Sequence, residues 1–463
     1  MTNVRAVAAV ALGWVLLFVG EAAAVPASPD PEFKVMDLEP VWAGHSVRFA
    51  LLSHGGKQFT AYFDADRMLS VAERALDSAE WKITKLDSKL GWDSHNYLTL
   101  AVDRDGYLHL SGNMHCVPLV YFRSELPLDA SSMKPVHRMT GEREGKTTYP
   151  VFYRGPQGEL IFAYRDGSSG DGDTLFNVYD MKSKTWTRLH DGPLLDGRGE
   201  MNAYPVGPEL GPDGYYHLTW VWRSAIMAET NRDLSYMRSR DFKHWETADG
   251  KPVRLPVTPD NKDVLVDPVP VNGGILNGSG KVGFDLNGVP VIAYHKFDKE
   301  GNTQLYFARH SAGSWQITQA SQWDYRWEIK GGGSIPAEIR HGALVAEGGA
   351  LAIGIEHVKE GRGRWAVDPG TLRLKEKLAQ PEPRFLLPPK LRRPLSDFPE
   401  MKIQMAEDSG ATDDGYLYRL RWESLGPNRD QPRPKPWPEA TMLRVVGWKK
   451  QAPEPAPTAK PIL

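Results

Sequence analysis

Short runs of alternating apolar and polar residues, each preceded by a glycine-containing turn, recur along most of the chain. The clearest copies lie at Asp103–Ser111, Gly155–Tyr164 and Gly211–Trp220, and weaker copies lie at Asp285–Tyr294 and Ala346–Gly354. Alternation with a period of two is typical of β-strands that bury one face, and glycine marks the turns between them. The pattern therefore predicts an all-β protein.

Segments that end in tryptophan separate these copies. They are Ser183–Trp186, Ser239–Trp245 and Ser311–Trp315, and they resemble degenerate Asp-box turns of sialidase-like propellers. Turn, strand and tryptophan recur about every 50 to 70 residues, which suits four-stranded blades with loops. We expect a single β-propeller of about seven four-stranded blades. Because the repeats are imperfect, a pair of β-sandwiches or a β-helix remains open at this point.

The last part of the chain adds two more alternating segments. Gly415–Trp422 and Ala440–Gly447 read as strands, and the proline-rich loop Pro427–Pro438 separates them. We expect these strands to close the ring against the N-terminal strands. Residues 449–463 are rich in proline, alanine and lysine, a composition typical of a disordered tail.

The first 24 residues resemble a targeting segment. Met1–Ala24 combines an early cation, Arg5, with an apolar run and the small-residue ending Ala22–Ala24. This order is typical of a signal peptide. We therefore expect a secreted or periplasmic protein with no stable membrane insertion after cleavage, whose propeller occupies residues 25–448. An uncleaved membrane anchor is the alternative.

Charge and cysteine content narrow the function classes. Charged residues make up 25% of the chain and the formal net charge is −2, so no overall basic field favours nucleic acid or an anionic membrane. Local arginines must therefore hold any anionic substrate. The single cysteine, Cys116, forms no intramolecular disulfide, so the core and the sheet hydrogen bonds must stabilise the fold.

Unusual residues concentrate between His95 and Arg223. The motifs in this region are Asp93-Ser-His-Asn96, Asn113-Met-His115, Thr148-Tyr-Pro150, Tyr164-Arg-Asp-Gly-Ser-Ser-Gly170, Asn202-Ala-Tyr-Pro205 and Trp220-Val-Trp-Arg223. Later motifs are Ala293-Tyr-His-Lys296, Tyr325-Arg-Trp-Glu328 and Gly331-Gly-Gly-Ser334. In order and spacing this series resembles the BNR-repeat β-propeller group that includes ulvan lyases, which are polysaccharide lyases. The resemblance spans most of the chain after residue 24.

The resemblance implies roles for individual residues. His95 and His115 resemble the lyase histidines, Tyr149 the catalytic tyrosine, Arg165 the residue that neutralises the substrate carboxylate, and Tyr204 a tyrosine that contacts the substrate. Arg223 and Arg326 are second-rank candidates for contacts with a polyanion. The implied reaction is β-elimination in a uronic-acid-containing, ulvan-like polysaccharide.

This reaction needs a base for the C5 proton, an acid for the leaving oxygen and a cation for the carboxylate. Histidine, with an ordinary pKa near 6.5, acts as a base without much tuning, whereas tyrosine, near 10, acts more readily as an acid. We therefore expect His95 to be the base, Tyr149 the acid and Arg165 the cation, with His115 binding or orienting the sugar.

Structural roles compete with these functional ones. Histidines at strand ends, such as His109 and His217, are more often hydrogen-bonded structural residues than catalysts. Tyr149 precedes Pro150 and is also compatible with a turn aromatic packed on a blade. Arg165 is also compatible with a salt bridge to the adjacent Asp166.

No cofactor is expected, and a structural metal is doubtful. Relatives often offer a histidine and a cysteine in the segment after the Trp-Arg motif, whereas this chain has Arg232 and Ser235 there. His217 and His295 are the remaining candidate ligands. Two scattered histidines do not make a tetrahedral zinc site.

Two other functions remain open. A sialidase-like glycoside hydrolase needs paired carboxyl groups, or a tyrosine nucleophile with an acidic helper, and Asp166, Asp173 and Glu200 are the candidate acids. A non-catalytic carbohydrate-binding propeller needs none of these. In each case we expect a monomer that binds an anionic polysaccharide.

Overall fold

A computed structural model describes residues 33–379 and 386–450 of the 463-residue chain. The predicted signal peptide and nearly all of the predicted tail lie outside these residues. The described residues contain 31 β-strands in seven antiparallel sheets and three short 3-10 turns, at Ala130–Ser132, Ala228–Thr230 and Pro389–Leu391. No helix in the described part is long and apolar enough to cross a bilayer. The all-β prediction is confirmed.

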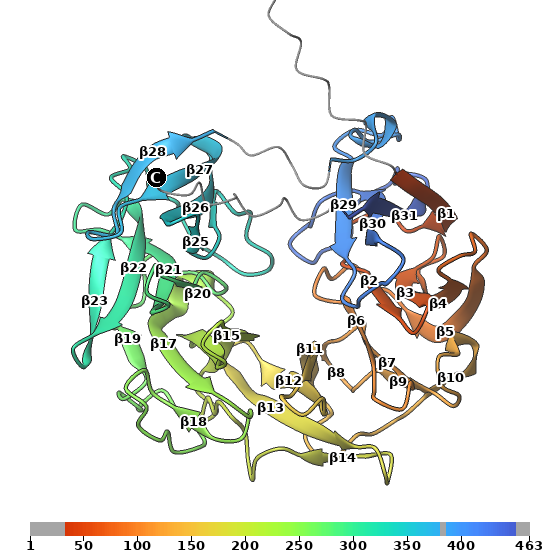
Figure 1. Cartoon of the computed structure of the whole chain (residues 1–463), viewed down its shortest axis with the longest axis horizontal. Coiled ribbons are helices and arrows are strands. Elements are labelled where there is room, and N and C mark those ends of the chain that lie inside the picture. Colours follow the sequence, from red (N-terminus) through yellow and green to blue (C-terminus); the bar gives the residue numbers. More distant parts are fainter. Residues whose placement is uncertain (1–32, 380–385, 451–463) are drawn as a thin grey trace, which may run out of the picture. The chain divides into compact units, whose positions relative to one another are not determined.

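The first three sheets after the N-terminal strand follow the chain in order (Figure 1). One comprises β2 (Ala50–His54), β3 (Lys57–Phe63), β4 (Met68–Ala75) and β5 (Lys82–Lys89). The next comprises β6 (Leu98–Val102), β7 (Leu108–Gly112), β9 (Tyr121–Ser124) and β10 (Met133–Pro135). The third comprises β8 (His115–Val117), β11 (Thr147–Arg154), β12 (Leu160–Ser168), β13 (Asp171–Asp180) and β14 (Thr185–Arg188).

Four further sheets complete the described chain. One comprises β15 (Asn202–Leu210), β16 (Tyr216–Arg223), β17 (Asn231–Ser239), β18 (Trp245–Glu246) and β19 (Leu265–Asp267). The next comprises β20 (Lys281–Phe284), β21 (Pro290–Phe297), β22 (Thr303–Ser311) and β23 (Ser314–Gln319). Another comprises β24 (Ile339–His341), β25 (Val345–Glu347), β26 (Ala350–His357), β27 (Gly361–Val367) and β28 (Leu374–Leu378). The last comprises β1 (Phe33–Val41), β29 (Lys402–Glu407), β30 (Tyr416–Ser424) and β31 (Thr441–Lys449).

The sheets lie side by side around a common centre, as in a β-propeller (Figure 1). Strand β1 pairs antiparallel with β31, so the first described strand completes the last sheet, as the sequence predicted. Four sheets have the expected four strands, and three have a fifth strand that the prediction did not include. Strand β31 extends through Lys449, one residue past the predicted end of the propeller.

An aspartate carboxylate organises several of the glycine-containing turns, including two that the sequence pattern marked. The Oδ1 atom of Asp103 accepts hydrogen bonds from the backbone N–H groups two and four residues later, and Asp285 and Asp298 repeat this arrangement. A glycine with positive φ lies inside each of these turns, where a side chain would be strained. Trp186 and Trp245 end their segments and are buried core residues, whereas Trp315 is only partly buried against the neighbouring cluster.

The sheet that joins both ends of the described chain contains a buried ion pair. Arg421 pairs with Glu423, and their side chains are 0% and 2% exposed. Glu423 also accepts hydrogen bonds from the backbone N–H groups of Leu395 and Ser396. The carboxylate therefore stabilises a buried cation and fixes the segment before β29.

Replacing Glu423 with alanine should lower the free energy of unfolding by about 3–5 kcal/mol, because the Arg421 charge would stay buried without its partner. Glu407→Ala, in the same sheet, removes an exposed partner of Arg419 and should cost less than about 1 kcal/mol. Urea denaturation of both variants measures the difference, and equal losses would contradict this role of the buried pair.

Candidate active site

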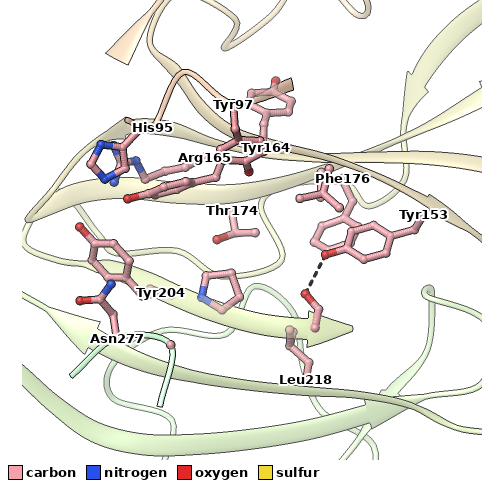
Figure 2. Close-up of a pocket in the computed structure, with 17 residues that line it drawn as sticks. His95, Tyr97, Tyr153, Tyr164, Arg165, Thr174, Phe176, Tyr204, Leu218 and Asn277 are labelled. Carbon is pink, nitrogen blue, oxygen red and sulfur yellow. Dashed lines mark hydrogen bonds between the residues drawn. The ribbon is translucent and has the colours of Figure 1, made fainter. Parts of the chain in front are cut away.

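Two adjoining cavities are lined by residues of β8, β11, β12, β15 and β16 and of the segments before β6 and β20. Their volumes are about 340 and 630 Å³, and His95, Tyr149, Tyr204 and Asn277 line both. Figure 2 shows His95 and Arg165 on one wall of the smaller cavity, with Tyr204 and Asn277 facing them. The structure therefore brings together the histidine, tyrosine and arginine motifs that the sequence analysis singled out.

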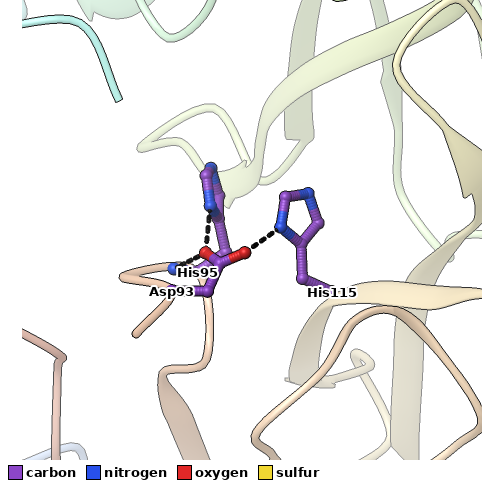
Figure 3. A group of neighbouring side chains, drawn as sticks. All are labelled: Asp93, His95 and His115. Carbon is purple, nitrogen blue, oxygen red and sulfur yellow. Dashed lines mark hydrogen bonds and ion pairs between the residues drawn. The ribbon is translucent and has the colours of Figure 1, made fainter. Parts of the chain in front are cut away.

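The Asp93 carboxylate joins the two candidate histidines. Its Oδ1 atom lies 2.6 Å from His95 Nδ1, and its Oδ2 atom is hydrogen-bonded to His115 Nδ1 (Figure 3). Oδ1 also accepts the His95 backbone N–H at 2.8 Å. Because each Nδ1 donates to the carboxylate, each ring directs its Nε2 atom away from Asp93. The imidazole rings lie close together, with centroids 4.3 Å apart and planes tilted by 37°.

A second carboxylate fixes the loop that carries His95. Asp430, from the proline-rich loop between β30 and β31, accepts hydrogen bonds from the Ser94 backbone N–H at 3.2 Å and the Ser94 hydroxyl at 2.8 Å. Asp430 Oδ1 also accepts a hydrogen bond from the Ser334 hydroxyl at 3.1 Å, and Asp430 Oδ2 lies 3.5 Å from His95 Nδ1. Segments from three distant parts of the sequence therefore hold His95 in place.

Strand β11 has an irregularity at the site. Its register with β12 shifts between Thr148 and Val151, and Tyr149 has a φ of 58°. Cys116, on the neighbouring strand β8, has a φ of 55°. Left-handed backbone is costly for side chains of this size and concentrates at functional sites. The bulge turns the Tyr149 side chain toward both cavities. Its ring also packs against the hydrophobic cluster that includes Tyr204, so Tyr149 both lines the site and has the packing contacts of the alternative.

Arg165 is a buried cation with unused donors. Its side chain is 3% exposed, and its Nη2 atom donates to Thr148 Oγ1 at 3.2 Å and to Cys116 Sγ at 3.3 Å. Its Nε and Nη1 atoms have no partner within the part of the chain that the structure describes. The alternative salt bridge to Asp166 is wrong, because Arg143 pairs with both Asp166 and Asp173. The guanidinium lies 4.9 Å from the Tyr149 ring centroid.

Tyr204 and Arg223 form the opposite side of the site. The Tyr204 hydroxyl lies 2.7 Å from Ser169 Oγ and accepts from Arg223 Nη1 at 3.5 Å. Arg223 also donates to the backbone carbonyls of Ala225 and Ile226, so it is held rigidly beside Tyr204. Both residues line the larger cavity.

The environment shifts the pKa of His115 and of Asp93. Burial alone would lower the pKa of His115, but the hydrogen bonds to Asp93 and Cys116 and the negative charge of Asp93 together outweigh burial and raise this pKa to about 9. Contacts with both histidines likewise overcome desolvation and hold the pKa of Asp93 well below its usual range. His115 is therefore a cation at neutral pH, and Asp93 is its anionic partner.

The pKa values of Cys116, Tyr149 and Tyr204 also differ from the ordinary values of a thiol and a phenol. Burial opposes ionisation of Cys116, yet the hydrogen bond to His115 and the charge of Arg165 lower its pKa to about 7. Burial and then Tyr204 raise the pKa of Tyr149. For Tyr204, Arg223 and Arg165 outweigh burial and lower the pKa. Tyr149 consequently keeps its proton over the whole physiological range.

Other predicted residues lie elsewhere. Arg326 does not join the site: it lines a separate small pocket, pairs with Glu328 at 2.6 Å and donates to the Gly301 carbonyl. The three carboxyl groups considered for hydrolysis, Asp166, Asp173 and Glu200, line neither cavity. His109 and His217 are buried in matching hydrogen-bond networks, each with a tyrosine hydroxyl and an aspartate, and are structural.

One group of side chains has the composition of a metal site. Ligand atoms of Asp93, His95 and His115 all lie within 4.8 Å of one another, and among the described residues this is the only such group of three. One carboxylate and two imidazoles suit a zinc-like ion. The Nδ1 atoms of His95 and His115 are already hydrogen-bonded to the Asp93 carboxylate. The expectation that no metal is bound remains a prediction.

Sequence reasoning missed three residues of the site. Asp93 stands in a quoted motif, two residues before His95, and that spacing was the available signal for its role. Cys116 was considered only for disulfide formation. Asp430 belongs to a loop more than 330 residues away from Ser94, its hydrogen-bond partner, and no local pattern marks it.

Solved structures with this architecture include polysaccharide lyases. A crystal structure of an ulvan lyase has a TM-score of 0.56 and 13% sequence identity, with 88% of this chain and 94% of that chain covered. A second crystallised polysaccharide lyase has a TM-score of 0.55, also at 13% identity, with 88% and 91% covered. At this identity the likeness establishes the fold.

The curated and family comparisons add sequence evidence. The short isoform of the ulvan lyase from Alteromonas sp. (strain LOR) is 37% identical over 89 residues, which is 18% of this chain and 17% of that enzyme. The match thus spans under a fifth of the relative's length. The model of the BNR repeat-containing family matches residues 57–323, more than half of the 463-residue chain. The protein therefore belongs to the BNR repeat-containing family.

Proposed function

We propose that this protein is a polysaccharide lyase that cleaves a uronic-acid-containing polysaccharide, ulvan-like in its chemistry, by β-elimination. The observation that carries the proposal is the buried Arg165 guanidinium, whose Nε and Nη1 donors lack partners among the described residues and which lines a cavity with His95 and Tyr149. A buried cation with two unused donors fits a planar carboxylate. A crystal structure of a related-fold ulvan lyase bound to -[GlcA(1-4)Rha3S]- adds support for a uronate ligand.

Arg165 acts on the substrate carboxylate. Removal of the C5 proton places negative charge next to the carboxylate, and the guanidinium stabilises that charge as it develops. Because Arg165 is already held by Thr148 and Cys116, little reorganisation is needed when the substrate binds. Because the Arg165 side chain is hardly exposed to water, its electrostatic attraction for the substrate carboxylate is stronger than it would be at the surface.

His95 acts as the base. Asp93 accepts its Nδ1–H, which leaves the Nε2 lone pair for the C5 proton. His115 is less suited to this role because its raised pKa keeps it protonated at neutral pH. The cationic His115 instead attracts and orients the anionic sugar beside the base.

Tyr149 acts as the acid. Its raised pKa keeps the phenol protonated, and its ring packs edge-to-face against that of His95 with centroids 5.7 Å apart, so proton acceptor and proton donor border the same part of the cavity. The C5–H electrons form the C4–C5 double bond, the C4–O bond breaks, and Tyr149 protonates the departing oxygen. Tyr204 and Arg223 contact the sugar on the facing wall.

We further propose that the protein acts after export, because Met1–Ala24 has the order of residues that is typical of a signal peptide. We also propose that it acts as a monomer. Two carboxyl groups, Asp93 and Asp430, line the larger cavity. A glycoside hydrolase is less well supported because Asp93 is hydrogen-bonded to both histidines and Asp430 to Ser94, so both carboxylates are already engaged.

The proposed function is tested by incubating the protein without residues 1–24 with a panel of uronate polysaccharides, ulvan included. Ultraviolet absorbance of the unsaturated uronate should rise with at least one of them. Saturated reducing ends without this absorbance would favour hydrolysis, and binding without turnover would favour a carbohydrate-binding propeller.

Tyr149→Phe should lower kcat by about 10²–10⁴-fold, because the leaving oxygen would lose its acid. The ring and its packing stay, so circular dichroism and thermal unfolding should match the wild type. A Tyr149→Phe protein with wild-type turnover would remove Tyr149 from the mechanism.

The activity should decline as the pH rises above about 9. The His115 pKa is raised to about 9, so the cation is fully present well below that pH and is lost as the pH rises through it. The pH profile of kcat/KM measures this limb. His115→Gln should have lower kcat/KM and no such limb, and an unchanged alkaline decline in that variant would contradict the assignment.

Iodoacetamide should inactivate the protein at neutral pH. The Cys116 pKa is lowered to about 7, so the thiolate fraction rises through pH 7 and is nearly complete by about pH 8, whereas an ordinary thiol, near 8.5, is still mostly protonated at pH 7. Cys116 lines the larger cavity, so its alkylation obstructs the site. Mass spectrometry and residual activity should change together between pH 6 and 9. The Cys116→Ser variant should keep its activity in the presence of iodoacetamide. Inactivation of that variant would exclude Cys116 as the target.

A further inference from the structure

A second polar cavity adjoins the candidate active site. Its volume is about 330 Å³, and strands β20, β21 and β24 contribute Lys281, His295 and His341 to its walls. Leu276 and Asn277 line both this cavity and the larger cavity of the active site. The two cavities therefore adjoin at the segment around Asn277, within reach of one bound polysaccharide chain.

His295 is the most unusual group in this cavity. It is 4% exposed, and neither ring nitrogen has a hydrogen-bond partner in the described part of the chain. Ser279, which is also buried, likewise has an unpartnered hydroxyl there. Buried polar atoms are nearly always hydrogen-bonded, and each one left unpaired costs about 1–3 kcal/mol. This concentration of unpaired donors and acceptors indicates a polar ligand.

The charges around the cavity are positive. Lys281 and Arg340 line it, and within residues 33–379 and 386–450 neither has an acidic partner. No aspartate or glutamate belongs to the lining. A cation site is excluded on this ground, and the described residues offer no third ligand that would make a metal group with His295 and His341.

The histidines themselves are neutral. Burial lowers the pKa of His295 to about 3 and that of His341 to about 4, and for His341 the charge of Lys281 contributes. His295 therefore offers one N–H donor and one acceptor nitrogen, whereas His341 Nδ1 donates to the Gly342 carbonyl and leaves only Nε2 as an acceptor. Trp327 stacks obliquely beside His295, with ring centroids 5.3 Å apart, and gives the cavity an apolar side. A sugar ring that carries an anionic group matches this combination of surfaces.

We infer that this cavity is a second sugar subsite, which binds an oxyanion group, a carboxylate or a sulfate ester, on a sugar near the one that is cleaved. The inference rests on the proposed function. Lys281 and Arg340 attract the oxyanion, and His295 and Ser279 hydrogen-bond to the sugar. The subsite thus selects for charge on a neighbouring sugar and fixes the register of the chain.

The test uses the Tyr149→Phe protein without residues 1–24, so that ligand is not consumed. Isothermal titration with a sulfated and a non-sulfated uronate oligosaccharide compares this protein with additional Lys281→Gln and His295→Phe changes. His295→Phe keeps the buried ring but replaces both nitrogens with carbon, so a merely structural His295 would tolerate it. Lys299→Gln, an exposed lysine in the turn after β21, is the matched control for charge.

Lys281→Gln and His295→Phe should each weaken binding about tenfold, and Lys299→Gln should not. If affinity falls only for the sulfated oligosaccharide, the group bound in the subsite is a sulfate ester. If affinity falls for both oligosaccharides, the bound group is a carboxylate. In the otherwise wild-type enzyme, Lys281→Gln should raise KM with kcat unchanged. Unchanged binding in both variants, with melting temperatures intact, would overturn the subsite. Because binding is measured without turnover, absence of cleavage by the wild type contradicts the proposed function separately.

Discussion

The Asp93 carboxylate, shared between His95 and His115, is the interaction on which the candidate site depends. One anion fixes the orientation of two rings. Its hydrogen bond and its charge also help to raise the pKa of His115 to about 9, so this ring is a cation at neutral pH. Asp430 reinforces this arrangement by fixing Ser94, between Asp93 and His95. Without the shared carboxylate, neither ring would have a defined role.

Arg165 supplies the complementary constraint. Its charge is buried, and its contacts with Thr148 and Cys116 leave two donors without partners among the described residues. An uncompensated buried charge destabilises a fold, so its persistence is explained most simply by a ligand that completes it. The β11 bulge serves the same site, since it turns Tyr149 toward the cavities at the cost of left-handed backbone. The rest of the propeller, including the buried pair of Arg421 and Glu423, must stabilise both features.

The sequence predicted the fold well because its signals are local. An aspartate or glycine turn followed by alternating residues is sufficient to mark a strand, and the strands at Gly415–Trp422 and Ala440–Gly447 formed the sheet with the N-terminal strand as expected. His95, His115, Tyr149, Arg165, Tyr204 and Arg223 gather in one place. Arg326 does not, because Glu328 and the Gly301 carbonyl hold it elsewhere.

The missed features depend on contacts between distant segments. Arg143 takes Asp166 and Asp173, which frees Arg165, and nothing in the local sequence predicts that exchange of partners. Asp430 reaches the site from the loop before the last strand, and the lowered pKa of Cys116 results from two neighbours brought together by β8 and β12. Hydrogen-bond partners of this kind are set by tertiary packing and cannot be read from periodicity.

The most direct measurement uses a uronate polysaccharide that carries deuterium at C5 of the uronic acid. Mass spectrometry of the products then reports whether the C5 hydrogen leaves during cleavage. The account predicts that the new non-reducing end has lost its deuterium and contains a C4–C5 double bond. A saturated product that retains deuterium at C5 would contradict β-elimination at this site.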